Sequence, residues 1–205
     1  MPMSPHLPDS DGVDLYWLPL GAGDAHPSVR QSGRLFEALV ARHEHRDRRD
    51  LYHSALEVRL DGERFVVEMA PVWSNETPDP AVVCEGAVGL SCLRVSRFFR
   101  YEIHRWRDGV IPDRAEAVAS PQQLSADRGR AQRVLELVPM FPNATWGRDE
   151  LRTGEMWNSN SLTAWLLARS GHDTEALVPP PGGRAPGWSA GLSVAIRQMS
   201  KAAVA

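Results

Sequence analysis

Three side chains in this chain of 205 residues are suited to acyl transfer: a serine, a histidine and a glutamate. Ser159 follows Trp157 and Asn158 and precedes an apolar run that begins at Leu162, so we expect it to open a helix. The N–H groups at a helix start have no partner within the helix, and the helix dipole favours negative charge there. A serine at this position can therefore attack a carbonyl while the N–H groups stabilise the oxyanion.

A serine nucleophile requires a base, and the base requires a group that orients it. His53 and Glu68 lie on two consecutive predicted strands and can supply these two roles. Each side chain also has a simpler explanation: the histidine as a hydrogen-bonded strand residue, the glutamate as the partner of an arginine, and Ser159 as a helix cap. Their combination in this chain order predicts a site with Ser159 as nucleophile, His53 as base and Glu68 as orienting group.

The motif Asn158-Ser159-Asn160-Ser161-Leu162 resembles the Asn-Cys-Asn-Thr/Ser-Phe/Leu pattern of circularly permuted papain-like proteins. These belong to the broad NlpC/P60 and lecithin–retinol-acyltransferase-like group. In that group a histidine on a strand comes first, a polar residue on the neighbouring strand follows, and a cysteine at a helix start comes last. The resemblance covers roughly residues 50–170. It implies a permuted papain-like fold that hydrolyses or transfers an acyl group on an amide or ester.

The chain departs from the family pattern at the nucleophile, where Ser159 stands in place of cysteine. A serine hydroxyl is far less acidic than a thiol and needs a general base in the transition state. Two functions are therefore open. One is an acyl hydrolase or acyltransferase with a Ser-His-Glu arrangement, and the other is a catalytically inactive papain-like binding module that recognises a peptide, a cell-wall fragment or a protein partner. A third alternative is an unrelated mixed fold in which the motif match is accidental.

The resemblance places the substrate beside the Ser159 motif. The expected substrate-binding residues are Asn158, Asn160, Trp157 and Tyr52. A small molecule or a peptide is the expected substrate. Acyl transfer through a serine requires no cofactor and no metal ion, and we predict neither.

A β-hairpin is expected to carry His53 and Glu68. Residues 51–60 and 63–70 alternate in polarity and are joined by Asp61-Gly62, the strongest short hairpin signal. A two-residue loop pairs Leu60 with Glu63, which puts Glu68 opposite Ala55 and diagonally next to His53 on one face. The other face then carries the apolar side chains Leu56, Val58, Phe65, Val67 and Met69.

The remaining patterns predict an α+β fold, with an antiparallel sheet around a central buried helix. Strands are expected at 13–18, 87–95 and 98–106, and helices at 28–43, at 121–138 and from 158 or 159 to 171. Ser120 and Pro121 suit the N-cap and first position of the second helix. The third helix is apolar nearly all round, which is typical of a buried helix. The tail is expected as a surface loop ending in a short strand or helix, and His104 is a second candidate histidine.

Composition limits the classes of partner. The formal net charge of −3 gives no reason to expect nucleic acid or an anionic membrane surface. No apolar stretch approaches the ~20 residues that span a bilayer, and no signal peptide opens the chain, so we expect a cytoplasmic protein. Two cysteines, Cys84 and Cys92, are too few for a disulfide framework. We expect a flexible arm over residues 1–12 and one papain-like domain over 13–205.

Overall fold

The computed structural model describes residues 10–20, 37–38, 41–42, 45–72, 81–89 and 99–204. Within these ranges a seven-stranded sheet has the order β4-β5-β3-β2-β1-β6, and β7 lies beside β2. The strands are β1 (Gly12–Pro19), β2 (Asp50–Leu60), β3 (Glu63–Pro71), β4 (Val82–Ala87), β5 (Arg100–Arg107), β6 (Val118–Ser125) and β7 (Gly183–Arg184). All neighbours on the main path are antiparallel, and only the short β7 pairs in parallel.

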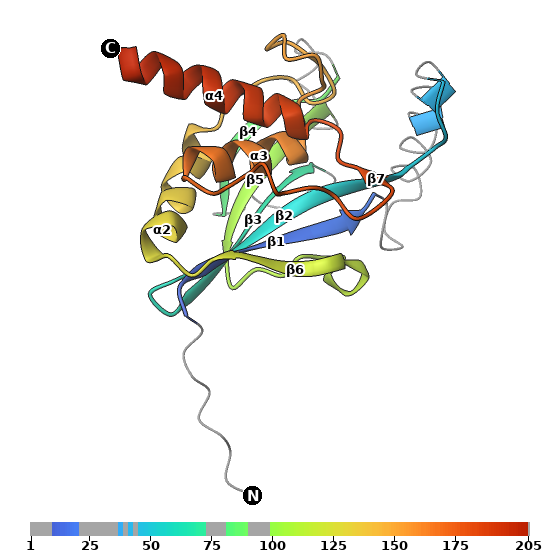
Figure 1. Ribbon diagram of the computed structural model, residues 1–205. Helices are drawn as coiled ribbons and strands as arrows, with labels where there is room; N and C mark the ends of the chain where they lie inside the picture. The colour runs from blue at the N-terminus through green and yellow to red at the C-terminus, as the bar shows by residue number, and fades with distance from the viewer. Residues whose placement is uncertain are drawn as a thin grey trace, which may run out of the picture.

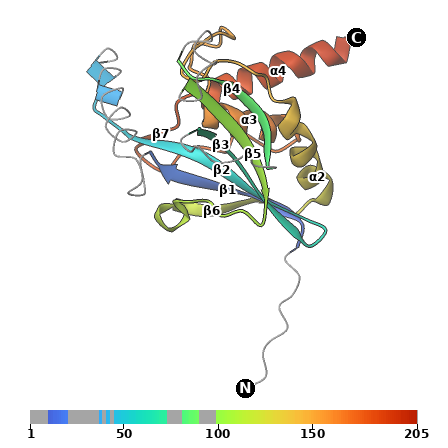
Figure 2. The same cartoon turned by 180° about the vertical axis from the view of Figure 1, so that it is seen from behind.

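Three helices cover one face of this sheet, as both cartoon views show (Figure 1, Figure 2). They are α2 (Arg128–Leu137), α3 (Ser159–Arg169) and α4 (Trp188–Val204). There are also two short 3-10 helices: η3 (Arg114–Glu116) precedes β6, and η4 (Val138–Met140) follows α2. The helix α3 packs against β2, β3, α2 and α4, and its residues from Ser159 to Leu167 are all buried. The predicted α+β class and the central buried helix are thus confirmed.

The hairpin formed by β2 and β3 has the predicted register. Leu56 pairs with Val67 and Leu60 pairs with Glu63. The backbone φ angles of Asp61 and Gly62 are 54° and 77°, the positive values that a two-residue hairpin turn requires at both central positions. This register fixes which side chains of the hairpin share a face.

The sheet is buried on both faces, by different elements. The face under the helices carries the main core, which includes Trp17, Leu56, Val58 and Val67. The opposite face carries a smaller cluster, whose members are Tyr16, Leu18, Ala55, Val66 and Ile111. Ile111 is 1% exposed and belongs to residues 108–117, which we call the strap. The strap lies over the sheet face opposite the helices.

One predicted helix is wrong in its first half. Residues 118–125 form β6, which pairs with β1, and α2 begins only at Arg128. Ser120 does not cap a helix, because its Oγ accepts a hydrogen bond from the backbone N–H of Trp17 at 2.8 Å. Asp127 caps α2 instead, accepting from the Arg130 N–H at 2.7 Å. Pairing with β1 therefore outweighs the local helix-start signal.

Other segment boundaries also shift. Of the strand expected at 87–95 only residues 87–89 are described, and of these only Ala87 belongs to a strand, as the last residue of β4. The rest of β4 was not predicted from the sequence, and residues 90–98 lie outside the described residues. The tail ends in α4, a helix of 17 residues, rather than a short element. Of the helix expected at 28–43 only four residues are described, and they are helical; residues 1–9 of the expected arm also lie outside. In the part of the chain that the structure describes, no helix is both long and apolar enough to span a bilayer.

Candidate functional site

A capping box closes the start of α3. The Asn158 side-chain Oδ1 accepts hydrogen bonds from the N–H groups of Asn160 at 3.0 Å and Ser161 at 3.3 Å. The Ser161 hydroxyl in turn accepts from the Asn158 N–H at 3.1 Å, which completes a capping box. Ser159 is the first helical residue, as predicted. However, two of the N–H groups that an oxyanion would use are already bonded to Asn158.

Asn160 connects α3 to two other segments. Its side-chain amide donates to the Tyr52 carbonyl and to the Pro186 carbonyl, each at 2.9 Å. Its Oδ1 accepts from the Ser54 hydroxyl at 2.8 Å. Asn158 also donates to the Pro186 carbonyl, at 2.8 Å. Both asparagines that the sequence predicts as substrate-binding residues thus bond to the protein itself.

The two aromatic residues predicted for substrate binding lie in the main core. Trp157 is 2% exposed and stacks on Phe141 with ring centroids 4.7 Å apart. Tyr52 is 8% exposed, and its ring lies against Gly183, where an added Cβ would approach within 2.4 Å. These contacts give both rings a packing role in the described structure.

The sheet separates Ser159 from His53. Ser159 is 4% exposed on the helix side, where Ser54 bonds to α3 through Asn160. Side chains alternate along a strand, so His53 points to the other face. Its partner on β1 is Leu18, a member of the smaller cluster, whereas the partner of Ser54 is Trp17 in the main core. No hydrogen bond joins His53 to Ser159 among the described residues, which corrects the expected contact between nucleophile and base.

His53 and Glu68 do share a face, as predicted. The pairing of β1 with β2 puts Tyr16 opposite Ala55, and the pairing of β3 with β5 puts Glu68 opposite His104, with all four residues on the face opposite the helices. We call these four residues the inner row. On the same face Leu18 lies opposite His53, and Ala70 lies opposite Glu102; we call these four residues the outer row. The structure therefore places His53, Glu68 and the second candidate histidine, His104, on one face of the sheet, without Ser159.

Burial shifts the titration of the acid and the base in these rows. Glu68 is 8% exposed, and burial, aided by the negative charge of Asp113 on the strap, raises its pKa to about 7. Burial lowers the pKa of the partly buried His53 to about 4. At neutral pH the imidazole of His53 is therefore uncharged, whereas the Glu68 carboxyl is divided between its two protonation states.

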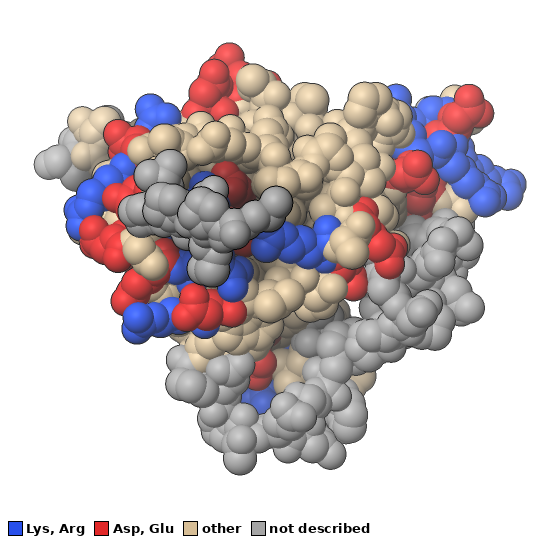
Figure 3. All heavy atoms as spheres, turned by 90° about the horizontal axis from the view of Figure 1, so that it is seen from below, with Lys and Arg blue, Asp and Glu red and all other residues tan. Residues whose placement is uncertain are grey.

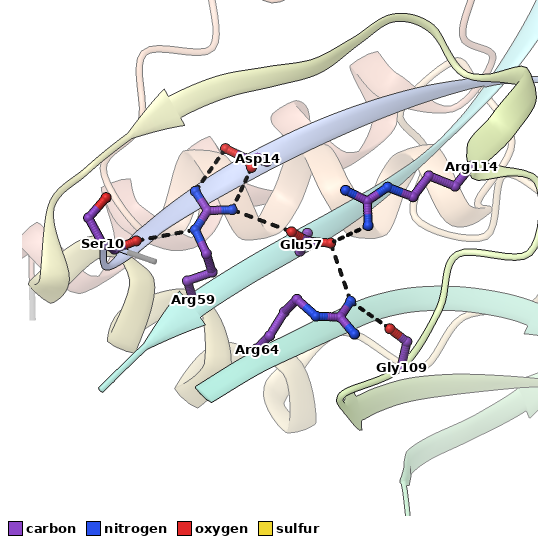
Figure 4. Close-up of polar contacts among 7 residues, drawn as sticks. All are labelled: Ser10, Asp14, Glu57, Arg59, Arg64, Gly109 and Arg114. Carbon is purple, nitrogen blue, oxygen red and sulfur yellow. Dashed lines mark hydrogen bonds and ion pairs between the residues drawn. The ribbon is translucent and has the colours of Figure 1, made fainter. Parts of the chain in front are cut away.

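A charge network around Glu57 and Asp14, drawn in Figure 4, lies on the same face of the sheet as His53, since Glu57 is four residues after His53 on β2. The Glu57 carboxylate, 6% exposed, meets guanidinium nitrogens of Arg59 at 3.4 Å, Arg64 at 3.4 Å and Arg114 at 3.2 Å. Arg59 also pairs with Asp14 at 2.6 Å. The arginines thus neutralise the carboxylates at one end of the face.

Two further contacts describe the surroundings. His104 Nε2 lies 3.3 Å from a Glu102 carboxylate oxygen, and its ring lies 4.2 Å from that of Trp106, centroid to centroid. Acidic and basic side chains lie intermixed on the side of the molecule opposite the helices (Figure 3). Among the described residues, no group of three His, Cys, Asp or Glu side chains is arranged to hold a metal ion.

The sequence pointed to the hairpin face but not to its full membership. Tyr16 belongs to the inner row through the pairing of β1 with β2, and His104 through the pairing of β3 with β5, both of which join segments far apart in the sequence. The alternation of residues 98–106 was the available signal for His104. Comparison with family models, with curated proteins and with solved structures finds no match for this chain.

Proposed function

We propose that this chain is a non-catalytic, papain-like binding module that recognises a peptide or a small molecule. The observation that carries the proposal is the separation of the expected catalytic side chains by the sheet. Ser159 is buried against the helix side, whereas His53 and Glu68 lie on the opposite face. A general base must reach the proton that it abstracts, directly or through one water molecule.

The capping of α3 supports the same proposal. An oxyanion site requires N–H groups aimed at the place where negative charge develops. At the start of α3 the Asn158 side chain accepts from the N–H groups of Asn160 and Ser161. The motif that resembles the family pattern thus fixes α3 to β2 and to the segment before α4.

The competing proposal is a serine hydrolase or acyltransferase, which the position of Ser159 as the first residue of α3 favours. Reaction with a fluorophosphonate probe and hydrolysis of activated esters separate the two proposals. We expect no labelling of Ser159 and no turnover, either in the natural chain or in Ser159→Cys. The introduced thiol should titrate like an ordinary buried cysteine, because among the described residues no base contacts Ser159.

A known serine hydrolase serves as the positive control for the probe, and Ser200→Ala, at an exposed position of α4, serves as the matched variant. The free energy of unfolding of Ser159→Ala should lie within about 1 kcal/mol of that of the natural chain, because a single hydroxyl near a helix start contributes about that much to stability. Stoichiometric labelling that is lost in both Ser159→Ala and His53→Ala would overturn the binding-module proposal.

A further inference from the structure

We propose that α4 pairs with α4 of a second copy of this chain, along an apolar stripe that the domain leaves largely exposed. The stripe consists of Leu192, Ile196, Met199 and Ala203, and we call it the α4 stripe. This inference goes beyond the proposed binding function and does not depend on it, because the stripe shares no residue with the Ser159 motif or with the face that carries His53 and Glu68.

The four residues of the α4 stripe recur at the spacing of a coiled-coil seam. They follow one another at intervals of four, three and four positions, which places them on one side of the helix. A different side of α4 meets the domain: Gly191 lies against α3, and Val194 and Ala195 are 7% and 0% exposed. The helix therefore has two apolar sides, and the contact with α3 uses only one of them.

The middle of the α4 stripe is exposed although its side chains are large and apolar. Ile196 is 57% exposed and Met199 is 40% exposed. Ala203 is exposed as well, and Leu192 is partly buried where the stripe meets the main core. Both cartoon views show that α4 extends past the end of α3 (Figure 1, Figure 2). A contiguous apolar surface of this kind is typical of an interaction site.

The charges of α4 lie away from the stripe and give no advantage to an acidic partner. The helix contains two basic residues and no acidic one. Lys201 is two positions from both Met199 and Ala203, which puts it on the opposite side of the helix. Arg197 donates to the backbone carbonyls of residues 151–152, at 2.8 Å and 2.9 Å. A helix seated on the stripe therefore meets neither cation.

The positions that flank the α4 stripe suit a copy of the same helix. Ser193 and Ser200 lie on one side of it, and Ala195 and Ala202 lie on the other. In coiled coils these flanking positions usually carry the charges that choose the partner. Here all four side chains are small and uncharged. An identical helix can therefore approach closely without facing a like charge.

A two-fold axis between Ile196 and Met199 makes the α4 stripe complementary to itself. With the two helices antiparallel, Ile196 packs on Met199 of the partner subunit, and Leu192 packs on Ala203 of the partner subunit, a large side chain against a small one. The antiparallel order also puts opposite ends of the two helix dipoles together. Such a contact closes on itself, so it produces a dimer rather than a fibre.

The length of the α4 stripe sets the expected strength of the dimer. A seam of about three helical turns is smaller than the ~800 Å² per partner of a stable complex, so we expect a Kd of about 0.1 mM. Sedimentation equilibrium of the full chain, from micromolar to millimolar concentration, measures it. Ile196→Glu puts a charge at the centre of the seam, and Lys201→Glu, at an exposed position on the opposite side of α4, is the matched control.

We expect Ile196→Glu to weaken the dimer at least tenfold, because the seam would bury an unpaired carboxylate, and Lys201→Glu to leave the Kd unchanged. Added salt should also leave the Kd unchanged, because the seam is uncharged. A natural chain that stays monomeric at millimolar concentration, an assembly larger than a dimer, or equal weakening by both variants would overturn the inference. A monomer that instead binds lipid vesicles or an acidic helical peptide would also overturn it. The natural chain alone decides the question if Ile196→Glu does not fold.

Discussion

At the scale of single residues, Glu68 imposes a cost on the folded state that depends on pH. Its folded pKa is about 7, above the ordinary value of 4.5. Between these two values the folded chain keeps a proton that the unfolded chain releases, so this group's contribution to stability is lost as pH rises through that window. A carboxyl that is buried for stability alone would not be left in this state, which fits a residue retained for binding.

The variant Glu68→Gln should therefore gain stability relative to the natural chain as pH rises. From pH 5 to pH 8 the difference between their free energies of unfolding should grow by about 2.5 kcal/mol, since one pKa unit corresponds to about 1.4 kcal/mol. Urea titrations at several pH values measure this difference, and the contribution of His53 cancels because both proteins contain it. Parallel curves for Glu68→Gln and the natural chain would contradict the prediction.

The pairing of His53 with Glu68 on one face could be predicted because Asp61-Gly62 fixes the hairpin register within a short segment. The separation of His53 from Ser159 could not. Alternation says which side chains share a face, but not which face the helices cover. Both faces of β2 carry apolar residues, with Leu56 on the helix side and Ala55 on the other. Only the packing of distant segments decides between them.

At the scale of elements, the contact between α3 and α4 depends on a glycine. An added Cβ at Gly191 would lie 2.3 Å from the Ser161 carbonyl oxygen and 3.0 Å from the Ala164 side chain. The two helices therefore approach each other at backbone distance. The sequence predicted the buried character of α3 from its apolar surface, but the tail gave no clear helical pattern, so this partner was missed.

We expect Gly191→Ala to destabilise the chain by about 1–3 kcal/mol, the usual cost of overpacking a tight core. Without the contact, alanine would stabilise a helix relative to glycine by about 0.5–1 kcal/mol, so the sign of the effect is informative. Ser200→Ala, exposed on the same helix, should change stability by a few tenths of a kcal/mol. Thermal unfolding followed by circular dichroism makes the comparison, and a stabilised Gly191→Ala would show that α4 does not pack as described.

At the scale of the whole molecule, the sheet has an apolar side and a polar side. The helices enclose the main core on one face, whereas the strap closes part of the other face over polar residues and few apolar ones. Arg64 donates to the Gly109 carbonyl of the strap at 2.7 Å, and Arg114 of the strap reaches Glu57 at 3.2 Å. Glu57 is thus the point at which the strap is tied to the hairpin (Figure 4).

Removing the charge of Glu57 should consequently loosen the polar side while the helix side stays folded. In Glu57→Gln the guanidinium groups of Arg59, Arg64 and Arg114 stay together, and the described ion pairs leave them the Asp14 carboxylate, which pairs with Arg59. Breaking a buried ion pair from one side costs about 3–5 kcal/mol. The half-exposed Arg64 and Arg114 can turn toward solvent, which puts the expected loss near the lower end, about 3 kcal/mol.

Urea unfolding monitored by tryptophan fluorescence measures the total loss, and hydrogen exchange measures opening of residues 108–117. The control is Glu85→Gln, because Glu85 is 46% exposed and pairs with Arg100 alone at 3.1 Å, a contact that contributes about 0–1 kcal/mol. Exchange in the strap should quicken in Glu57→Gln and not in the control. If the two variants lose the same stability, the strap is held by the burial of Ile111 rather than by charge, because the apolar contact is unchanged in both.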